Sequence, residues 1–178
     1  MSRRDESEGA GLNEFGETDR ILSVDLEETD ETPPPELDQE RRIAVFDLVE
    51  ESRFALSGSA AISQTAGGPY RLRLGADGDI LRLTVASAEN APLAEIKEPM
   101  GEIREAVVDY VALCDDYRAG VRKLAPSQIE KIDEARREAH LEGAEALAEA
   151  LAPTVKMDDQ TARRFFTVLC AAIGRLDA

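Results

Sequence analysis

The sequence has few of the residues that most often hold metals or carry out catalysis. Its 178 residues include one histidine and two cysteines, and the cysteines do not form a C-x-x-C pair. Structural zinc sites need four such ligands, so we expect no metal and no other cofactor. Cys114 and Cys170 lie far apart within apolar helical patterns, which predicts buried, reduced thiols. The sequence also lacks a G-x-S-x-G nucleophile motif and a phosphate-binding P-loop.

Long hydrophobic runs are absent as well. The sequence has no apolar stretch of about 18 residues, and this excludes a membrane-spanning helix. The first residues, from Met1 to Glu6, lead into acidic sequence without the apolar segment of a secretory signal. We therefore expect a cytoplasmic protein, in agreement with its reduced thiols.

What the sequence has in excess is negative charge. Asp and Glu number 37 against 21 Lys and Arg, for a formal net charge of −16. Most of the excess lies in residues 1–40, and we predict a disordered acidic leader over residues 1–19 followed by a single α+β domain over residues 20–178. A surface of this sign argues against nucleic-acid phosphates as the main ligand.

Alternating patterns predict a small antiparallel β-sheet. Apolar residues alternate with arginines from Tyr70 to Leu74, and the alternation returns from Leu81 to Val85. An Asp-Gly pair between the two segments favours a tight turn, so we predict a hairpin over residues 70–86. Similar patterns predict further strands near residues 20–26 and 93–97.

The other patterns are helical. A helix is predicted over residues 38–54, with Ile43, Phe46 and Val49 on one apolar stripe. In the second half, two long helices separated by Pro126 predict a helical hairpin, and a terminal helix follows. The first of them carries an unbroken apolar seam at Ile103, Val107, Tyr110, Cys114, Tyr117, Val121 and Leu124. The predicted fold class is α+β, with the sheet packed against these helices.

Arg136 and His140 are the strongest candidates for a site, because they lie one helical turn apart on the inner face of the second long helix. If the two long helices fold back about Pro126, Arg136 and Arg137 face Asp115 and Asp116, and His140 faces Val111. An interhelical set of ion pairs is then expected. The small residues Ala139 and Gly143 on the same face would let another helix approach closely.

A second interpretation treats the same residues as an anion-binding pocket. Arg136 and His140 would act with Arg163 of the terminal helix or with Tyr70 and Arg71 of the sheet. Arg163 and Arg164 lie in the first turn of the terminal helix, which is the unfavourable end for positive charge. Surface solvation, or pairing with the acidic leader or with an acidic partner, would explain them.

Four segments of the chain resemble those of a known protein family. They are Gly68-Pro69-Tyr70-Arg71-Leu72, the run from Pro126 to Asp133, Arg136-Arg137 followed by His140-Leu141-Glu142-Gly143, and Thr161 to Thr167. In this order and over residues 20–175 they resemble uncharacterised protein family 0262 of the alphaproteobacteria. The family has a shorter loop before Gly-Pro-Tyr and a polar residue at the position of Leu141. The resemblance implies a bacterial cytosolic protein of the same fold, and it brings no activity with it.

Two functions from different classes follow from these observations. The first is a non-enzymatic protein-interaction or regulatory module with a protein partner, in which the acidic leader acts as a tethered ligand. The second is a binder or enzyme for a small anionic metabolite that uses Arg136 and His140. A homodimer through the seam of residues 103–124 is compatible with either.

Overall fold

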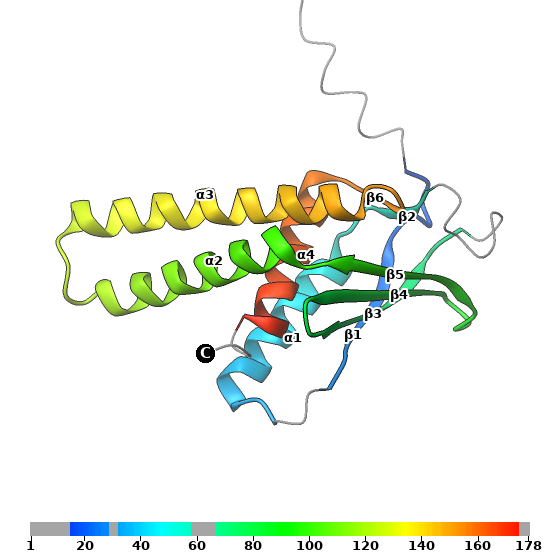
Figure 1. Ribbon diagram of the computed structural model, residues 1–178, viewed down its shortest axis with the longest axis horizontal. Coiled ribbons are helices and arrows are strands. Elements are labelled where there is room, and N and C mark those ends of the chain that lie inside the picture. Colours follow the sequence, from blue (N-terminus) through cyan, green and yellow to red (C-terminus); the bar gives the residue numbers. More distant parts are fainter. Residues whose placement is uncertain (1–14, 29–31, 58–66, 175–178) are drawn as a thin grey trace, which may run out of the picture.

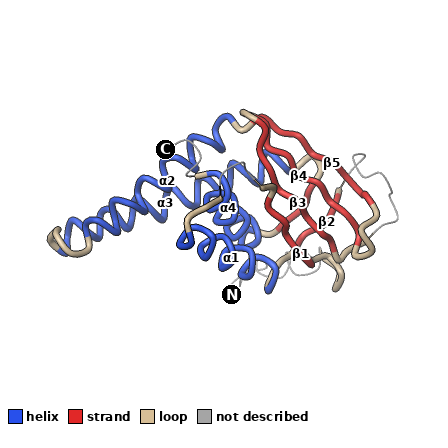
Figure 2. The backbone as a smooth tube through the Cα atoms, turned by 90° about the horizontal axis from the view of Figure 1, so that it is seen from below, coloured by secondary structure: helices blue, strands red, loops and turns tan. Residues whose placement is uncertain are grey.

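The computed structural model describes residues 15–28, 32–57 and 67–174. The acidic leader predicted over residues 1–19 therefore lies outside the described residues except for its last five. The chain is an α+β protein in which four helices accompany a four-stranded sheet and a small two-stranded sheet (Figure 1). Figure 2 shows the helices gathered on one side of the main sheet. No helix in the described ranges is long and apolar enough to cross a membrane.

The main sheet contains β1 (Ile21–Leu26), β3 (Tyr70–Asp77), β4 (Ile80–Ser87) and β5 (Pro92–Pro99), in the order β1-β3-β4-β5. The predicted hairpin is confirmed: β3 and β4 pair antiparallel, and Gly78 adopts the positive φ of 58° that their turn requires. Aliphatic side chains of both strands are buried on the helix side of the sheet. The strand expected near 93–97 is the edge strand β5.

The sheet is mixed, whereas the sequence predicted an antiparallel one. β1 pairs with β3 in parallel, and the residues between these strands form α1 (Pro35–Glu50) and β2 (Phe54–Leu56). A parallel pair needs such a crossover connection, and alternation along a strand carries no information on its direction. β1 also contains a register irregularity between Ile21 and Ser23.

The helix expected over residues 38–54 runs instead from Pro35 to Glu50. Phe54, which the prediction placed at its end, begins β2, and β2 pairs antiparallel with β6 (Val155–Met157). Phe54 is buried, and its ring meets that of Tyr70 edge to face at 5.5 Å. Three-residue strands about one hundred residues apart are too short to produce a recognisable alternation.

The helical hairpin is confirmed as α2 (Gly101–Gly120) and α3 (Pro126–Leu151), which extends away from the sheet in Figure 1. The apolar seam of α2 is buried near the sheet at Ile103 and Val107. The last two residues of the seam, Val121 and Leu124, are exposed and lie beyond Gly120, where α2 ends. The terminal helix α4 (Asp159–Ile173) packs against α1, α2 and α3. Its N-cap Asp158 accepts the amide hydrogen of Thr161 at 2.9 Å.

Candidate functional site

Arg136 forms its ion pair within its own helix and not across the hairpin. Its guanidinium lies 2.6 Å from the carboxylate of Asp133, one turn earlier on α3, and 4.7 Å from the centre of the Tyr117 ring. The predicted pairing of Arg136 and Arg137 with Asp115 and Asp116 is therefore wrong. A carboxylate three residues away on the same helix satisfies the arginine, and α2 presents an aromatic face to it.

Arg137 shares the same carboxylate. Both arginines form ion pairs with Asp133, whose side chain is largely buried, while Arg137 itself extends into solvent. The hydrogen bonds from the two guanidinium groups, first from Arg136 and then from Arg137, lower the pKa of Asp133. Asp133 is a residue that sequence reasoning missed, although its spacing of three and four from the two arginines was a usable signal.

His140 lies in a half-buried position between α2, α3 and α4. Its Nε2 is 2.9 Å from Oγ1 of Thr167, and its ring centre lies 5.0 Å from that of Tyr110 and 5.4 Å from that of Phe166. The sequence analysis expected His140 to face Val111, but the ring that it meets on α2 is that of Tyr110, one residue earlier. The Thr167 hydroxyl donates to the carbonyl of Arg163 at 3.1 Å, so Nε2 of His140 is the donor in its bond to Thr167.

Burial lowers the pKa of His140, and the positive charges of Arg163 and Arg136 lower it further. The imidazole is therefore neutral at pH 7. His140 lies one turn after Arg136 on α3, and its partner Thr167 lies one turn after Arg163 on α4, so the three basic residues lie in the region where α3 faces α4. We call these three residues the helical basic cluster. Arg164 points elsewhere and binds the carbonyl of Glu51 at 2.7 Å and its carboxylate at 3.2 Å.

Tyr70 and Arg71 belong to the sheet and not to this cluster. Tyr70 is buried beside Phe54, and burial raises the pKa of its hydroxyl. The Nε of Arg71 donates to the carbonyl of Ala88 at 2.9 Å, which links β3 to the end of β4. The seven predicted site residues therefore do not form one site. Four belong to the helical basic cluster or neighbour it, two lie in the sheet, and Arg164 lies where α4 contacts the end of α1.

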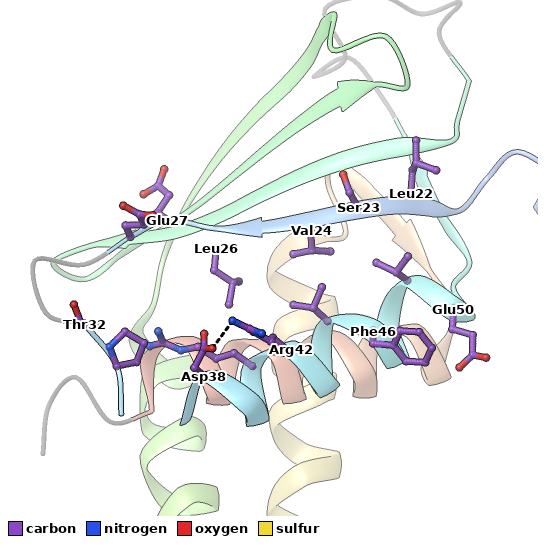
Figure 3. Close-up of a pocket in the computed structure, with 15 residues that line it drawn as sticks. Leu22, Ser23, Val24, Leu26, Glu27, Thr32, Asp38, Arg42, Phe46 and Glu50 are labelled. Atoms are coloured by element: carbon purple, nitrogen blue, oxygen red, sulfur yellow. Dashed lines mark ion pairs between the residues drawn. The ribbon is translucent and has the colours of Figure 1, made fainter. Parts of the chain in front are cut away.

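A second candidate site lies between β1 and α1, where the sequence analysis predicted no site. A groove of about 850 Å³ separates the two elements (Figure 3). Its apolar lining includes Leu22, Val24, Leu26, Val45, Phe46 and Val49. We call it the α1 groove.

The apolar stripe of α1 is largely exposed. Ile43 is 54% exposed and Phe46 is 63% exposed. In the same helix the buried apolar residues are Leu37, Ala44 and Leu48, which belong to a different face. The spacing of Ile43, Phe46 and Val49 correctly indicated an apolar surface, but spacing does not distinguish a core from a docking surface.

The charged residues of the α1 groove are mostly engaged within the chain. Arg41 donates to the carbonyls of Ala171 and Ala172 at 2.9 and 3.0 Å, near the C-terminal end of α4. Arg42 forms an ion pair with Asp38 at 2.8 Å, drawn as the dashed line in Figure 3. Both guanidinium groups have partners within the chain.

No group of three or more His, Cys, Asp or Glu residues in the described part of the chain could hold a metal ion. Both cysteines are free thiols, Cys170 buried and Cys114 half-buried. Burial raises the pKa of Cys170 well above its usual range. A thiol kept protonated in this way is a poor nucleophile.

Comparison with known proteins agrees with the fold and the sequence pattern. The profile of the Uncharacterised protein family (UPF0262) matches residues 18–175. The chain belongs to UPF0262. The UPF0262 protein of Paracoccus denitrificans is 39% identical over 155 residues, which cover 86% of this chain and 95% of that protein. The UPF0262 protein of Jannaschia sp. is 44% identical over 138 residues, covering 78% and 86% of the two chains.

A UPF0262 protein of Cereibacter sphaeroides is 41% identical over 152 residues, which cover 85% of this chain and 96% of that protein. These relatives confirm the family that the sequence resembled. No solved structure matches the chain.

Proposed function

We propose that this UPF0262 protein is a non-enzymatic cytoplasmic protein-interaction module that docks a partner protein on the α1 groove. The exposure of Phe46 beside the groove carries this proposal. A phenylalanine that is 63% exposed and lines an apolar groove extends the apolar surface open to solvent, and contiguous apolar surfaces mark protein-interaction sites. The free cysteines support a cytoplasmic location.

Site-specific photo-crosslinking tests the docking surface. A photo-reactive phenylalanine analogue is placed at Phe46 of the full chain and expressed in Paracoccus denitrificans, the source of a close relative. We expect a prominent adduct with one protein, absent when the analogue replaces Val121, an exposed apolar residue on the far end of the helical hairpin. The purified partner should then bind the wild-type chain and not Phe46→Ser. Equal adducts at both positions, or none at Phe46, would contradict the proposal.

A second candidate function, the binding of a small anionic metabolite, is favoured by one observation. The helical basic cluster places Arg163 and Arg136 beside His140. Against it, Arg136 is already paired with Asp133, and His140 is neutral.

Calorimetric titration with inorganic phosphate and citrate separates the two functions. Anion binding that disappears in both Arg163→Met and His140→Ala would favour the metabolite. The interaction function predicts no binding heat for either ligand.

A further inference from the structure

The α1 groove has an unpaired strand edge as one of its walls. β1 pairs with β3, and within the described ranges no strand pairs with its other side. The amide of Glu27 donates to the carbonyl of Leu74 in β3. In a strand, the N–H and C=O of one residue point to one side, and those of the next residue point to the other. The N–H and C=O groups of Val24 and Leu26 therefore face away from β3, while their side chains point toward α1 (Figure 3).

The other edge of the same sheet is protected, and β1 is not. β5 begins with Pro92, ends with Pro99 and exposes Glu95 and Lys97, which are features that discourage the addition of another strand. The sequence of β1 contains neither proline nor lysine. The sheet thus combines one blocked edge with one edge able to accept a strand.

The charges around the groove indicate the sign of what binds there. Glu27 is paired with Arg82 at 2.5 Å, Arg42 with Asp38, and Arg41 with backbone carbonyls. Glu28 and Glu50 are exposed, and neither forms an ion pair with another described residue. Glu28 follows the end of β1, whereas Glu50 lies at the opposite end of the groove beside the start of β1 (Figure 3).

We propose, building on the function above, that an extended basic and apolar segment of the partner protein binds in the α1 groove by adding a strand to the free edge of β1. Its backbone would exchange hydrogen bonds with Val24 and Leu26, and alternate apolar side chains would pack on Phe46 and Val49. Lysine or arginine residues near its two ends would pair with Glu28 and Glu50. β1 has six residues, so the paired part of the segment spans about 20 Å.

Two other possible occupants of the α1 groove carry an excess of negative charge, as the groove itself does. A second copy of this chain would bring Glu28 and Glu50 of one groove close to the same acidic groups of the other, and the formal charge of each chain is −16. The remaining N-terminal sequence of the same chain is also acidic in excess. A basic segment of another protein is complementary to the groove.

Peptide selection tests the chemistry of the segment. A random library of twelve-residue peptides displayed on phage is selected against the full-length protein, and the best binder is measured by fluorescence anisotropy. We expect apolar residues at alternate positions and Lys or Arg toward the ends. Binding should weaken at least about tenfold with Phe46→Glu and with the double change Glu28→Lys and Glu50→Lys. The matched controls Val121→Glu and Glu89→Lys, exposed but outside the groove, should change it less than about twofold.

Backbone methylation tests the added strand itself. Each amide of the selected peptide is N-methylated in turn. Strand addition predicts that the affinity falls at least about tenfold at alternate positions only, because every second N–H of the peptide faces β1. Peptides with apolar residues three and four apart, or insensitivity to methylation, would overturn strand addition while leaving the docking function intact.

Two further outcomes would overturn the proposal. The groove would not be the binding site if the selected peptides bound Phe46→Glu as well as the wild-type chain, or if no selected peptide depended on Phe46. Crosslinking at Phe46 then decides separately whether the docking function stands. A dimer in sedimentation that Phe46→Glu dissociates would make a second copy the occupant.

Discussion

His140 is the only histidine of the chain, and its ring is enclosed by Tyr110 and Phe166 with Nε2 bonded to Thr167. Burial and the nearby arginines lower its pKa in the folded protein below the ordinary value of 6.5. Between the folded pKa and 6.5 the unfolded chain therefore binds more protons than the folded chain. This residue alone makes the folded state less stable as the pH falls through about 6.5, and its contribution is fully present at higher pH.

We expect the replacement His140→Gln to reduce the loss of stability between about pH 7.5 and 5.5, because glutamine does not titrate. Urea unfolding of both proteins at the two pH values measures the difference. The carboxylates titrate equally in both proteins and cancel in the comparison. An unchanged pH dependence would mean that the imidazole titrates alike in the folded and unfolded states. The single imidazole signal in an NMR titration gives the folded pKa directly.

Phe46 and Leu48 are two residues apart on α1 and lie in opposite surroundings, since Phe46 is 63% exposed and Leu48 is fully buried. We expect Phe46→Ser to change the free energy of unfolding by less than about 0.5 kcal/mol. Leu48→Ala should cost about 2–5 kcal/mol, because it leaves a cavity in the core. Chemical denaturation of the two variants checks this. A large loss for Phe46→Ser would show that its ring is part of the core and not a docking surface.

At the scale of elements, α3 and α4 meet at a glycine. A Cβ atom added to Gly143 would lie 2.2 Å from the ring of Phe166, and both residues are buried. The sequence predicted this close approach from the small residues on the inner face of α3. Alanine elsewhere in a helix is favoured over glycine by up to about 1 kcal/mol.

We expect Gly143→Ala to destabilise the protein by about 1–3 kcal/mol despite that preference, because the added methyl group has no space. Thermal or urea unfolding provides the measurement. The same replacement in a Phe166→Leu background serves as the control and should cost less, since the smaller side chain makes room. Gly143→Ala with wild-type stability or above would show that the helices can separate without loss.

Local patterns predicted the elements that are long and regular. The hairpin of β3 and β4 followed from alternation and an Asp-Gly turn, and α2 and α3 followed from apolar spacing around Pro126. The short strands β2 and β6 could not be predicted, because each is three residues long and its partner is remote. The parallel direction of β1 and the pairing of Arg136 with Asp133 depend on tertiary placement, which spacing alone does not fix.

At the scale of the whole molecule, the exposed apolar surface and the free strand edge lie side by side. The helices cover one face of the sheet, and α1 lies beneath β1 so that the groove opens along the edge of the sheet (Figures 2 and 3). The sequence contained both halves of this groove, a strand without proline or lysine and an apolar helical stripe. Only the fold shows that the two are adjacent.

Hydrogen–deuterium exchange of individual backbone amides, followed by NMR on the full-length protein with and without the selected peptide, tests the docking groove most directly. We expect the amides of Val24 and Leu26 to exchange quickly in the free protein and at least about tenfold more slowly in the complex, because the added strand bonds them. The amide of Glu27, already bonded to Leu74, should change little. Unchanged exchange at Val24 and Leu26 in a saturated complex would contradict binding at the edge of β1.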